Sequence, residues 1–324
     1  MEASGRGEDV DRYLAWAASE QLTVVRVLAM AKHLFELTPE VGDAHLDALL
    51  DKAGRAGLFV EIVALADTAS YAIDPAEQVA RIGAIAARHP NVFLEIANEP
   101  YHDTQQPRVR DDAYLATLLA RVPEPVLAAL GEAGYPRVYS TGDYATAHMT
   151  RSSGAGGWGH VRDLIEARRM LRETARPLVS DEPMGAGPSF EPGRRDNSAE
   201  RFRAAALFTR MLGVGATFHY EGGLQARIPT GAELECFKAW QQAWTLLPAD
   251  FTGSTLEETG PGRIVTALGA KAAGSYVASQ ENRAWLLAFG VEGPAAPVWA
   301  AGWTPGPCTI WERSLLCAAS RTPQ

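Results

Sequence analysis

Two glutamates occur in the same local context, at the end of an apolar run and directly before a proline. Glu99 lies in Ile96-Ala-Asn-Glu-Pro100, and Glu182 lies in Leu178-Val-Ser-Asp-Glu-Pro183. A proline biases the residue before it toward an extended backbone and ends a strand, so each carboxyl group is predicted to be held at a strand end. Two such groups facing each other can cleave a glycosidic bond, because one protonates the leaving oxygen while the other attacks the anomeric carbon. The two roles need different pKa values and therefore different surroundings.

Polar side chains follow most of the other apolar runs. In a parallel barrel the carboxyl ends of the strands form the active site, so residues at these ends are candidate contacts. The run ends carry Asp67, Asn98, Asp143, Tyr144, His148, Arg151, Asp181, His219, Tyr220 and Glu221, and Arg26 lies inside a run. From this set the predicted substrate contacts are Asn98, Arg26, His148, His219 and Tyr220.

Some of these candidates have an alternative interpretation. A charged group in an apolar strand needs a carboxylate nearby, so Arg26 is equally well a buried ion-pair partner. The side chains of His148, His219 and Tyr220 either touch the substrate or support residues that do.

Two other carboxylates and one tryptophan are also candidates for the site. Asp181 competes with Glu182 for the nucleophile role, but we expect it to point away from the site or to cap the loop. Glu221 is a third carboxylate, ranked lower because no proline fixes its geometry. Trp158 lies in the glycine-rich stretch 153–159. Its ring offers a flat apolar surface to sugar C–H groups, so we include it among the predicted substrate contacts. The alternative is that it packs back on the barrel.

The elements that must position these residues alternate between helix and strand from residue 8 to about 248. Helical spacing of apolar residues predicts helices at Asp9–Glu20, Ala44–Ala56, Pro75–Arg88, Asp111–Ala133, His160–Thr174, Ala199–Leu212 and Gly231–Leu246. Short apolar runs, typical of strands buried on both faces, predict strands at Leu22–Met30, Leu58–Leu65, Val92–Ala97, Arg137–Thr141, Ala145–Thr150, Pro177–Ser180 and Ala216–Tyr220.

This alternation predicts an α/β fold made of parallel βα units. At this length a (β/α)₈ TIM barrel is favoured over an open doubly wound sheet. The pattern begins on a helix, so the first strand of a full barrel is absent from it. Either that strand lies upstream of Met1, or the barrel closes with seven strands or an unusual segment.

The texture changes after Pro248. Short alternating runs separated by turn residues predict a small antiparallel β-module. They lie at Arg263–Leu268, Ser275–Ala278, Ala284–Phe289, Pro297–Ala301 and Cys308–Arg313. We therefore predict a catalytic barrel over residues 1–248 and a β-rich module over 249–324. The module's tryptophans are assigned to its core, with glycan binding as the alternative.

The composition argues against several classes of protein. The 324 residues include 30 Lys and Arg against 39 Asp and Glu, a net charge of −9. Nucleic acid is therefore not an expected partner, because phosphate binding needs clustered positive charge. No apolar run reaches the ~18 residues that span a bilayer, so no membrane association is expected. The first residues contain no hydrophobic signal core, which leaves localisation open between the cytoplasm and secretion with the signal missing.

The cysteines and histidines lack the spacing of metal ligands. Cys236, Cys308 and Cys317 form no Cys-x-x-Cys motif, which excludes a zinc ribbon, an iron–sulfur motif and a disulfide scaffold. Unpaired thiols are expected, with a Cys308–Cys317 bridge as the alternative. Without a His/Asp cluster, neither a catalytic metal nor a cofactor is expected.

In these motifs the sequence resembles the large clan of (β/α)₈ glycoside hydrolases that carry paired glutamates on strands four and seven, the cellulase-like enzymes of family 5 among them. The resemblance rests on the two Glu-Pro motifs, with support from Val25-Arg26-Val27 and His148, and covers roughly residues 8–248. It implies that Glu99 is the acid/base, Glu182 the nucleophile and Asn98 a substrate contact, and that Arg26 steadies the nucleophile. It differs from the family after strand eight, where His219-Tyr220 stands in place of a frequent tryptophan.

The sequence therefore predicts hydrolysis of O-glycosidic bonds in a poly- or oligosaccharide by a retaining double displacement. One alternative is a catalytically degenerate barrel that binds carbohydrate without cleaving it, which the absent first strand favours. Another is metal-assisted hydrolysis, which the missing ligand cluster disfavours. The expected partner is the carbohydrate itself, and the sugar, the linkage and the oligomeric state are left open.

Overall fold

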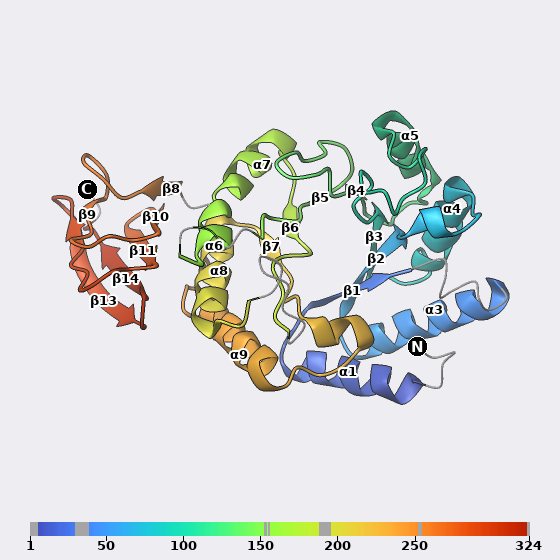
Figure 1. Cartoon of the computed structure of the whole chain (residues 1–324), viewed down its shortest axis with the longest axis horizontal. Coiled ribbons are helices and arrows are strands. Elements are labelled where there is room, and N and C mark those ends of the chain that lie inside the picture. Colours follow the sequence, from blue (N-terminus) through green and yellow to red (C-terminus); the bar gives the residue numbers. More distant parts are fainter. Residues whose placement is uncertain are drawn as a thin grey trace. The chain divides into compact units, whose positions relative to one another are not determined.

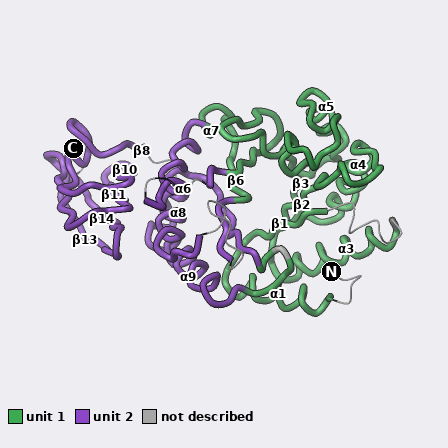
Figure 2. The backbone as a smooth tube through the Cα atoms, viewed as in Figure 1, with its two compact units in different colours: residues 1–148, 170–182, 222–228 green, residues 149–169, 183–221, 229–324 purple. Residues whose placement is uncertain are grey.

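The computed structural model describes residues 6–29, 39–151, 154, 156–187, 196–251 and 255–322. The chain divides into two compact units (Figure 2). Unit 1 contains residues 1–148, 170–182 and 222–228, and unit 2 contains residues 149–169, 183–221 and 229–324. Each unit has a hydrophobic core of its own. The division into residues 1–248 and 249–324 stays a prediction.

Unit 1 is built on a four-stranded parallel sheet with the strand order β1-β2-β3-β4 (Figure 1). The strands are β1 (Val24–Leu28), β2 (Phe59–Leu65), β3 (Val92–Ala97) and β4 (Ala128–Gly131). A further parallel pair joins β5 (Ala145–Thr146) to β6 (Leu178–Ser180). The helical segments of unit 1 are α1 (Gly7–Ser19), α3 (Pro39–Arg55), η2 (Thr68–Ser70), α4 (Pro75–Ala86), α5 (Asp112–Thr117) and η3 (Leu118–Arg121). The predicted parallel βα units are confirmed here.

Local sequence explains these elements. Every residue of β2 after Phe59 is buried, as expected for a parallel strand covered on both faces. Helix α4 begins with Pro75 in its first turn, and the Asp74 side chain accepts hydrogen bonds from the free N–H groups of Ala76 and Glu77. Pro75 removes one of the N–H donors that the start of a helix leaves unpaired, and Asp74 satisfies two others.

The helix predicted at 111–133 is observed only over residues 112–121, and the strand predicted at 137–141 is wrong. The helical segment ends at Arg121, before Pro123 and Pro125, and the chain then forms β4. Proline lacks the N–H that a helix interior needs, so these two residues stop the helix. The strand predicted at 22–30 is observed as β1, and Met30 lies outside the described residues.

Unit 2 combines helices with a five-stranded antiparallel sheet of order β13-β14-β11-β10-β8 (Figure 1, orange to red). The sheet strands are β8 (Thr255–Glu258), β10 (Gly274–Gln280), β11 (Arg283–Phe289), β13 (Thr304–Ile310) and β14 (Ser314–Ser320), and β9 (Val265–Ala267) pairs with β12 (Val298–Trp299). The helices are α6 (Gly159–Asp163), α8 (Ala199–Leu212) and α9 (Gly231–Thr245), with the short strand β7 (Gly215–Ala216). Helix α7 (Glu166–Thr174) and the turn η4 (Glu221–Gln225) have residues in both units.

The antiparallel sheet packs against α8. The Phe208 ring lies 4.6 Å from that of Tyr276, and Glu200 accepts a hydrogen bond from the Ser314 hydroxyl at 2.9 Å. Trp285 is buried and contacts Phe251 edge-on, as a core residue does. The prediction missed β8 and β14.

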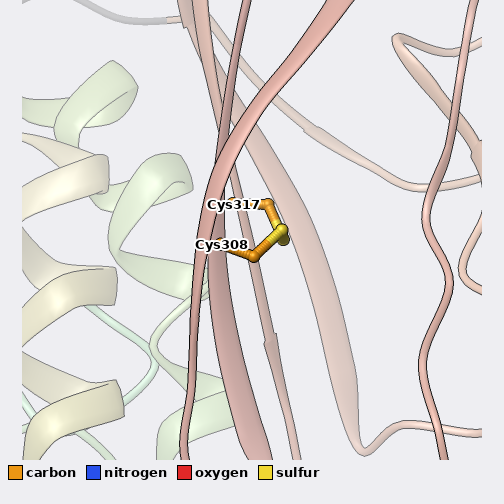
Figure 3. The surroundings of a disulfide bond; sticks show 2 residues. All are labelled: Cys308 and Cys317. Atoms are coloured by element: carbon orange, nitrogen blue, oxygen red, sulfur yellow. A yellow bond between two sulfur atoms is a disulfide. The ribbon is translucent and has the colours of Figure 1, made fainter.

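Cys308 and Cys317 form a disulfide between β13 and β14 (Figure 3). The expectation of unpaired thiols for these two residues is therefore wrong. The disulfide forms because the register of β13 and β14 places the two cysteines directly opposite each other, with Cα atoms 4.0 Å apart. This pairing could not be predicted because β14 was not recognised from the sequence. Cys236 is a buried free thiol.

His160 in α6 is a buried histidine in unit 2. Neither ring nitrogen has a hydrogen-bond partner among the described residues, and the nearest carboxylate oxygen, on Asp196, lies 4.0 Å from Nε2. Burial lowers the pKa of His160 to about 4, against a smaller opposing effect of Asp196. The folded protein therefore holds this imidazole neutral.

Acidification is expected to destabilise the fold through His160. Since the folded pKa lies below the ordinary value, the unfolded chain takes up the proton first. The stabilising contribution is complete above about pH 6.5, is lost as the pH falls to about 4, and amounts to about 3 kcal/mol. Urea unfolding at several pH values should show this loss in the wild type and a correspondingly smaller one in His160→Leu. Equal pH slopes in the two proteins would contradict it.

Within the described ranges, no helix combines the length and the apolar character needed to cross a bilayer.

Candidate active site

The carboxyl ends of the unit 1 strands bring five of the predicted site residues together. Arg26 lies in β1, Asn98 and Glu99 follow β3, His148 follows β5, and Glu182 follows β6. These residues are joined by the contacts described below.

Arg26 is the cation at the centre of this group. Its guanidinium donates to Asn98 Oδ1 at 2.9 Å and to Glu95 Oε2 at 2.6 Å. It lies 3.0 Å from Asp181 Oδ2 and 3.4 Å from Glu182 Oε2, and its side chain is 9% exposed. Burial alone would lower its pKa, but the carboxylates of Glu95 and Asp181 raise the pKa well above the ordinary value. The arginine therefore stays charged, and its contacts link β1 to residues in or directly after β3 and β6.

His148 lies between the two predicted catalytic carboxyl groups. Its Nδ1 is 2.9 Å from Glu99 Oε1, and its Nε2 is 3.8 Å from Glu182 Oε2. One carboxylate oxygen of Glu99 and one of Glu182 lie within 4.8 Å of each other. Burial lowers the pKa of His148, but Asp181 and the hydrogen bond with Glu99 outweigh it, so the pKa is raised. The two glutamates are 26% and 21% exposed, which leaves both open to a ligand.

The backbone of Glu99 differs from the extended conformation expected before a proline. Its φ is +41°, in the left-handed region. For a residue with a side chain this conformation costs on the order of 1–3 kcal/mol and persists only where neighbours hold it. Such strain is common at functional sites, and here it falls on the predicted acid/base.

Three buried carboxyl groups beneath the site were missed or misplaced. Glu61 in β2 and Glu95 in β3 lie within apolar runs, and Asp181 points inward to Arg26 instead of away from the site. Burial raises the pKa of Glu61 to about 7 and that of Glu95 well above its usual range. The Tyr144 hydroxyl donates to Glu61 Oε1 at 2.8 Å. The sequence signal for Glu61 and Glu95 was an acidic residue inside an otherwise apolar run. Arg26, which also lies inside an apolar run, is the cation that such buried acids need.

Glu132, directly after β4, is a further carboxyl group that the sequence analysis missed. Its side chain is buried, 1% exposed. Burial raises its pKa, opposed by nearby His148, while Glu99 raises it further. It was missed because the predicted helix at 111–133 hid the strand end that carries it.

Three predicted substrate contacts, Trp158, His219 and Tyr220, belong to unit 2. Trp158 is 2% exposed and stacks on Phe289 with ring centroids 5.7 Å apart. The Trp158 ring is therefore covered by protein, with β11 of the antiparallel sheet on one face, and sugar contact by Trp158 stays a prediction. Tyr220 is buried beside Phe218, and the carbonyl of His219 accepts a hydrogen bond from the N–H of Ala186, which forms an isolated bridge with Tyr220. Sugar contact by His219 and Tyr220 stays a prediction.

Two overlapping sets of side chains have the spacing to hold a metal ion. The ligand atoms of Glu95, His148 and Asp181 lie within 4.8 Å of one another, and so do those of Glu99, His148 and Glu182. Arg26 already contacts three of these carboxylates, which supplies the positive charge that a metal would bring. The expectation of no metal stays a prediction.

No protein-family model and no curated protein matches this sequence. Solved structures do resemble it. A glycoside hydrolase family 5 protein from Bacteroides vulgatus has a TM-score of 0.63 at 12% identity, over 97% of this chain and 86% of that one. A GH5_18 protein from Bifidobacterium longum subsp. infantis has a TM-score of 0.54 at 14% identity, over 74% of each chain. The endo-1,4-β-D-mannanase from Thermotoga petrophila has a TM-score of 0.53 at 13% identity, over 73% of this chain and 95% of that one. These likenesses show the fold, an α/β fold of the (β/α)₈ type found in family 5 glycoside hydrolases.

Proposed function

We propose that the protein is a retaining glycoside hydrolase in which Glu99 is the acid/base and Glu182 the nucleophile. The observation that carries the proposal is the close approach of the two carboxyl groups, whose oxygens lie within 4.8 Å. Retaining enzymes place the two groups about 5–5.5 Å apart, whereas inverting enzymes need about 6.5–9.5 Å to admit a water. The fold likeness to family 5 glycoside hydrolases supports the same class of reaction.

In the first step the Glu182 carboxylate attacks the anomeric carbon while Glu99 protonates the departing oxygen. Arg26, 3.4 Å from Glu182, favours the ionised nucleophile. Arg26 also occupies the amide oxygen of Asn98. The amide nitrogen of Asn98 is then the group left to donate to a sugar hydroxyl.

In the second step Glu99 accepts a proton from the water that opens the glycosyl ester. His148 assists because its Nδ1 lies 2.9 Å from Glu99 Oε1, within hydrogen-bond reach of it. Its N–H stabilises the Glu99 carboxylate formed in the first step. Glu99 and His148 are thus proposed to act together in the proton transfers of both steps.

Two neighbouring structures support a proposed substrate class. One is a 1,4-β-D-mannanase, and another, a single-site variant of GH5_18 from Bifidobacterium longum subsp. longum, was solved with Manβ1-4GlcNAc and has a TM-score of 0.54 at 12% identity over 74% of this chain and 73% of that one. We infer a neutral β-linked oligo- or polysaccharide. The catalytic barrel would span residues 1–248, and residues 249–324 would form the β-module.

Hydrolysis is expected to release the product with retained configuration. A β-glycoside should give the β-anomer first, because two inversions at the anomeric carbon cancel. Proton NMR of the anomeric signals in the first minutes, with 4-nitrophenyl β-mannoside and β-glucoside and with β-1,4-mannooligosaccharides, measures this directly. Initial release of the α-anomer would refute a covalent intermediate on Glu182.

The same assay decides the alternative of a non-hydrolytic carbohydrate-binding barrel. Binding of the oligosaccharide by calorimetry without turnover of any substrate in the panel would support that alternative. Turnover lost in both Glu99→Gln and Glu182→Gln, with sugar affinity retained, would support the hydrolase.

A further inference from the structure

The segment after Glu99 is fastened to the loop after β2 by a buried glutamine, Gln105, whose surface is 1% exposed. Its Nε2 donates to the carbonyl oxygens of Asn98 at 2.5 Å and Leu65 at 3.2 Å. Its Oε1 accepts from the Thr68 hydroxyl at 2.7 Å. The amide orientation is fixed, because the nitrogen faces two carbonyls and the oxygen faces a hydroxyl.

The Asn98 carbonyl belongs to the peptide group that leads into Glu99. The N–H of Asn98 donates to Leu65 O at 2.9 Å, and its side chain is held by Arg26. Gln105 adds an anchor on the carbonyl side. The orientation of this peptide group is coupled to the φ of Glu99, which is +41°. Of these contacts, the Gln105 hydrogen bond is the one that acts on the strained linkage itself.

We infer that Gln105 is a positioning residue that keeps Glu99 in its left-handed conformation and so aims the Glu99 carboxyl group at the leaving oxygen. The inference rests on the proposed role of Glu99 as acid/base. Gln105 is buried, and its link to the proposed site runs through the Asn98 carbonyl that precedes Glu99. A displacement of about 1 Å at a catalytic group is enough to cost about 100-fold in rate.

The neighbouring Gln106 provides a matched control. Its Nε2 donates to three carbonyl oxygens of the same loop, at 3.3, 3.1 and 3.0 Å, those of Thr68, Tyr71 and Ile73. Gln106→Met therefore loosens the loop while the hydrogen bond to the Asn98 carbonyl remains. Gln105→Met removes that hydrogen bond and keeps approximately the same side-chain volume.

The test compares kcat/KM on two β-glycosides with the same sugar. One has a 2,4-dinitrophenolate leaving group, which departs without protonation, and the other is an unactivated oligosaccharide, which needs the acid. Gln105→Met is expected to lower kcat/KM about 100-fold on the oligosaccharide and less than about 5-fold on the dinitrophenyl glycoside. Gln106→Met should lower kcat/KM on both substrates by the same small factor, less than about 3-fold. This holds even if its Tm falls as much as that of Gln105→Met.

Equal losses on the two substrates in Gln105→Met, or the same split in Gln106→Met, would overturn the inference. If Gln105→Met does not fold, Thr68→Val takes its place, because it removes the hydroxyl that orients the Gln105 amide. A split of about 10-fold is then expected, and equal losses overturn the inference.

A wild-type protein that cleaves neither substrate overturns the proposed function separately. Crystal structures then judge Gln105 without reference to turnover. Glu99 leaving the left-handed region in Gln105→Met (or Thr68→Val), and not in Gln106→Met, supports the positioning role, and an unchanged φ overturns it.

Discussion

Replacing Glu182 with alanine is expected to lower kcat/KM for glycoside hydrolysis by about 10⁵-fold, which corresponds to about 7 kcal/mol of transition-state stabilisation. The change removes the proposed nucleophile and leaves Glu99 and His148 in place. The fold should survive, because the Glu182 side chain is 21% exposed and Arg26 keeps its contacts with Glu95 and Asp181. Initial rates with a dinitrophenyl β-glycoside measure the loss, and circular dichroism checks the fold.

Azide provides the control for this variant. The space vacated by the carboxylate admits a small anion on the same face of the sugar. Azide attack should restore turnover with the dinitrophenyl β-glycoside and give the α-glycosyl azide, because one inversion then replaces two. A variant that keeps a tenth of the wild-type rate, or a β-configured azide product, would exclude Glu182 as the nucleophile.

Replacing Arg26 with methionine is expected to destabilise the protein by about 3–5 kcal/mol and to abolish measurable turnover. The side chain is 9% exposed, and its loss leaves Glu95 and Asp181, both fully buried, without their cation. Two buried carboxyl groups then lack the guanidinium that offset the cost of burying them. Glu182 loses the same cation, so the nucleophile is affected together with the fold. Urea unfolding and initial rates measure the two effects.

A double substitution separates the stability effect from the catalytic one. Adding Glu95→Met to Arg26→Met removes a buried carboxylate that would otherwise stand unpaired, so at least about half of the lost stability should return. Turnover should stay absent, because Glu182 and Asn98 still lack their partner. Recovery of activity in the double variant would show that Arg26 serves the fold alone.

The residues proposed to carry out the reaction could be predicted from the sequence, whereas the buried charged residues that contact them could not. Glu99, Glu182 and Asn98 stand at ends of apolar runs, where backbone direction alone determines that they share one end of a parallel sheet. Glu61 and Glu95 lie inside such runs, and their meaning depends on which strands are neighbours. The register that places Arg26 opposite Glu61 is set by packing between β1 and β2, which no local pattern encodes.

The fold was predictable where periodicity was strong. Helix α8 and strand β3 occur at the predicted residues, because a long amphipathic run and a compact apolar run each permit one structure. The segment from 122 to 141 was assigned incorrectly, because Pro123 and Pro125 end the helix that the surrounding apolar residues suggested. That error hid Glu132. The left-handed backbone of Glu99 could not be foreseen either, because it depends on Gln105 and the loop after β2.

The discontinuity of unit 1 has a consequence for synthesis on the ribosome. Arg26, Glu61 and Glu95 emerge early, whereas Asp181 and Glu182 arrive in a later segment, and residues 222–228 complete the unit later still. A nascent chain that stops between 149 and 180 would carry the proposed acid/base without the proposed nucleophile, and it would lack two partners of Arg26, Asp181 and Glu182. Unit 1 is therefore complete only when residue 228 has been synthesised and has left the exit tunnel.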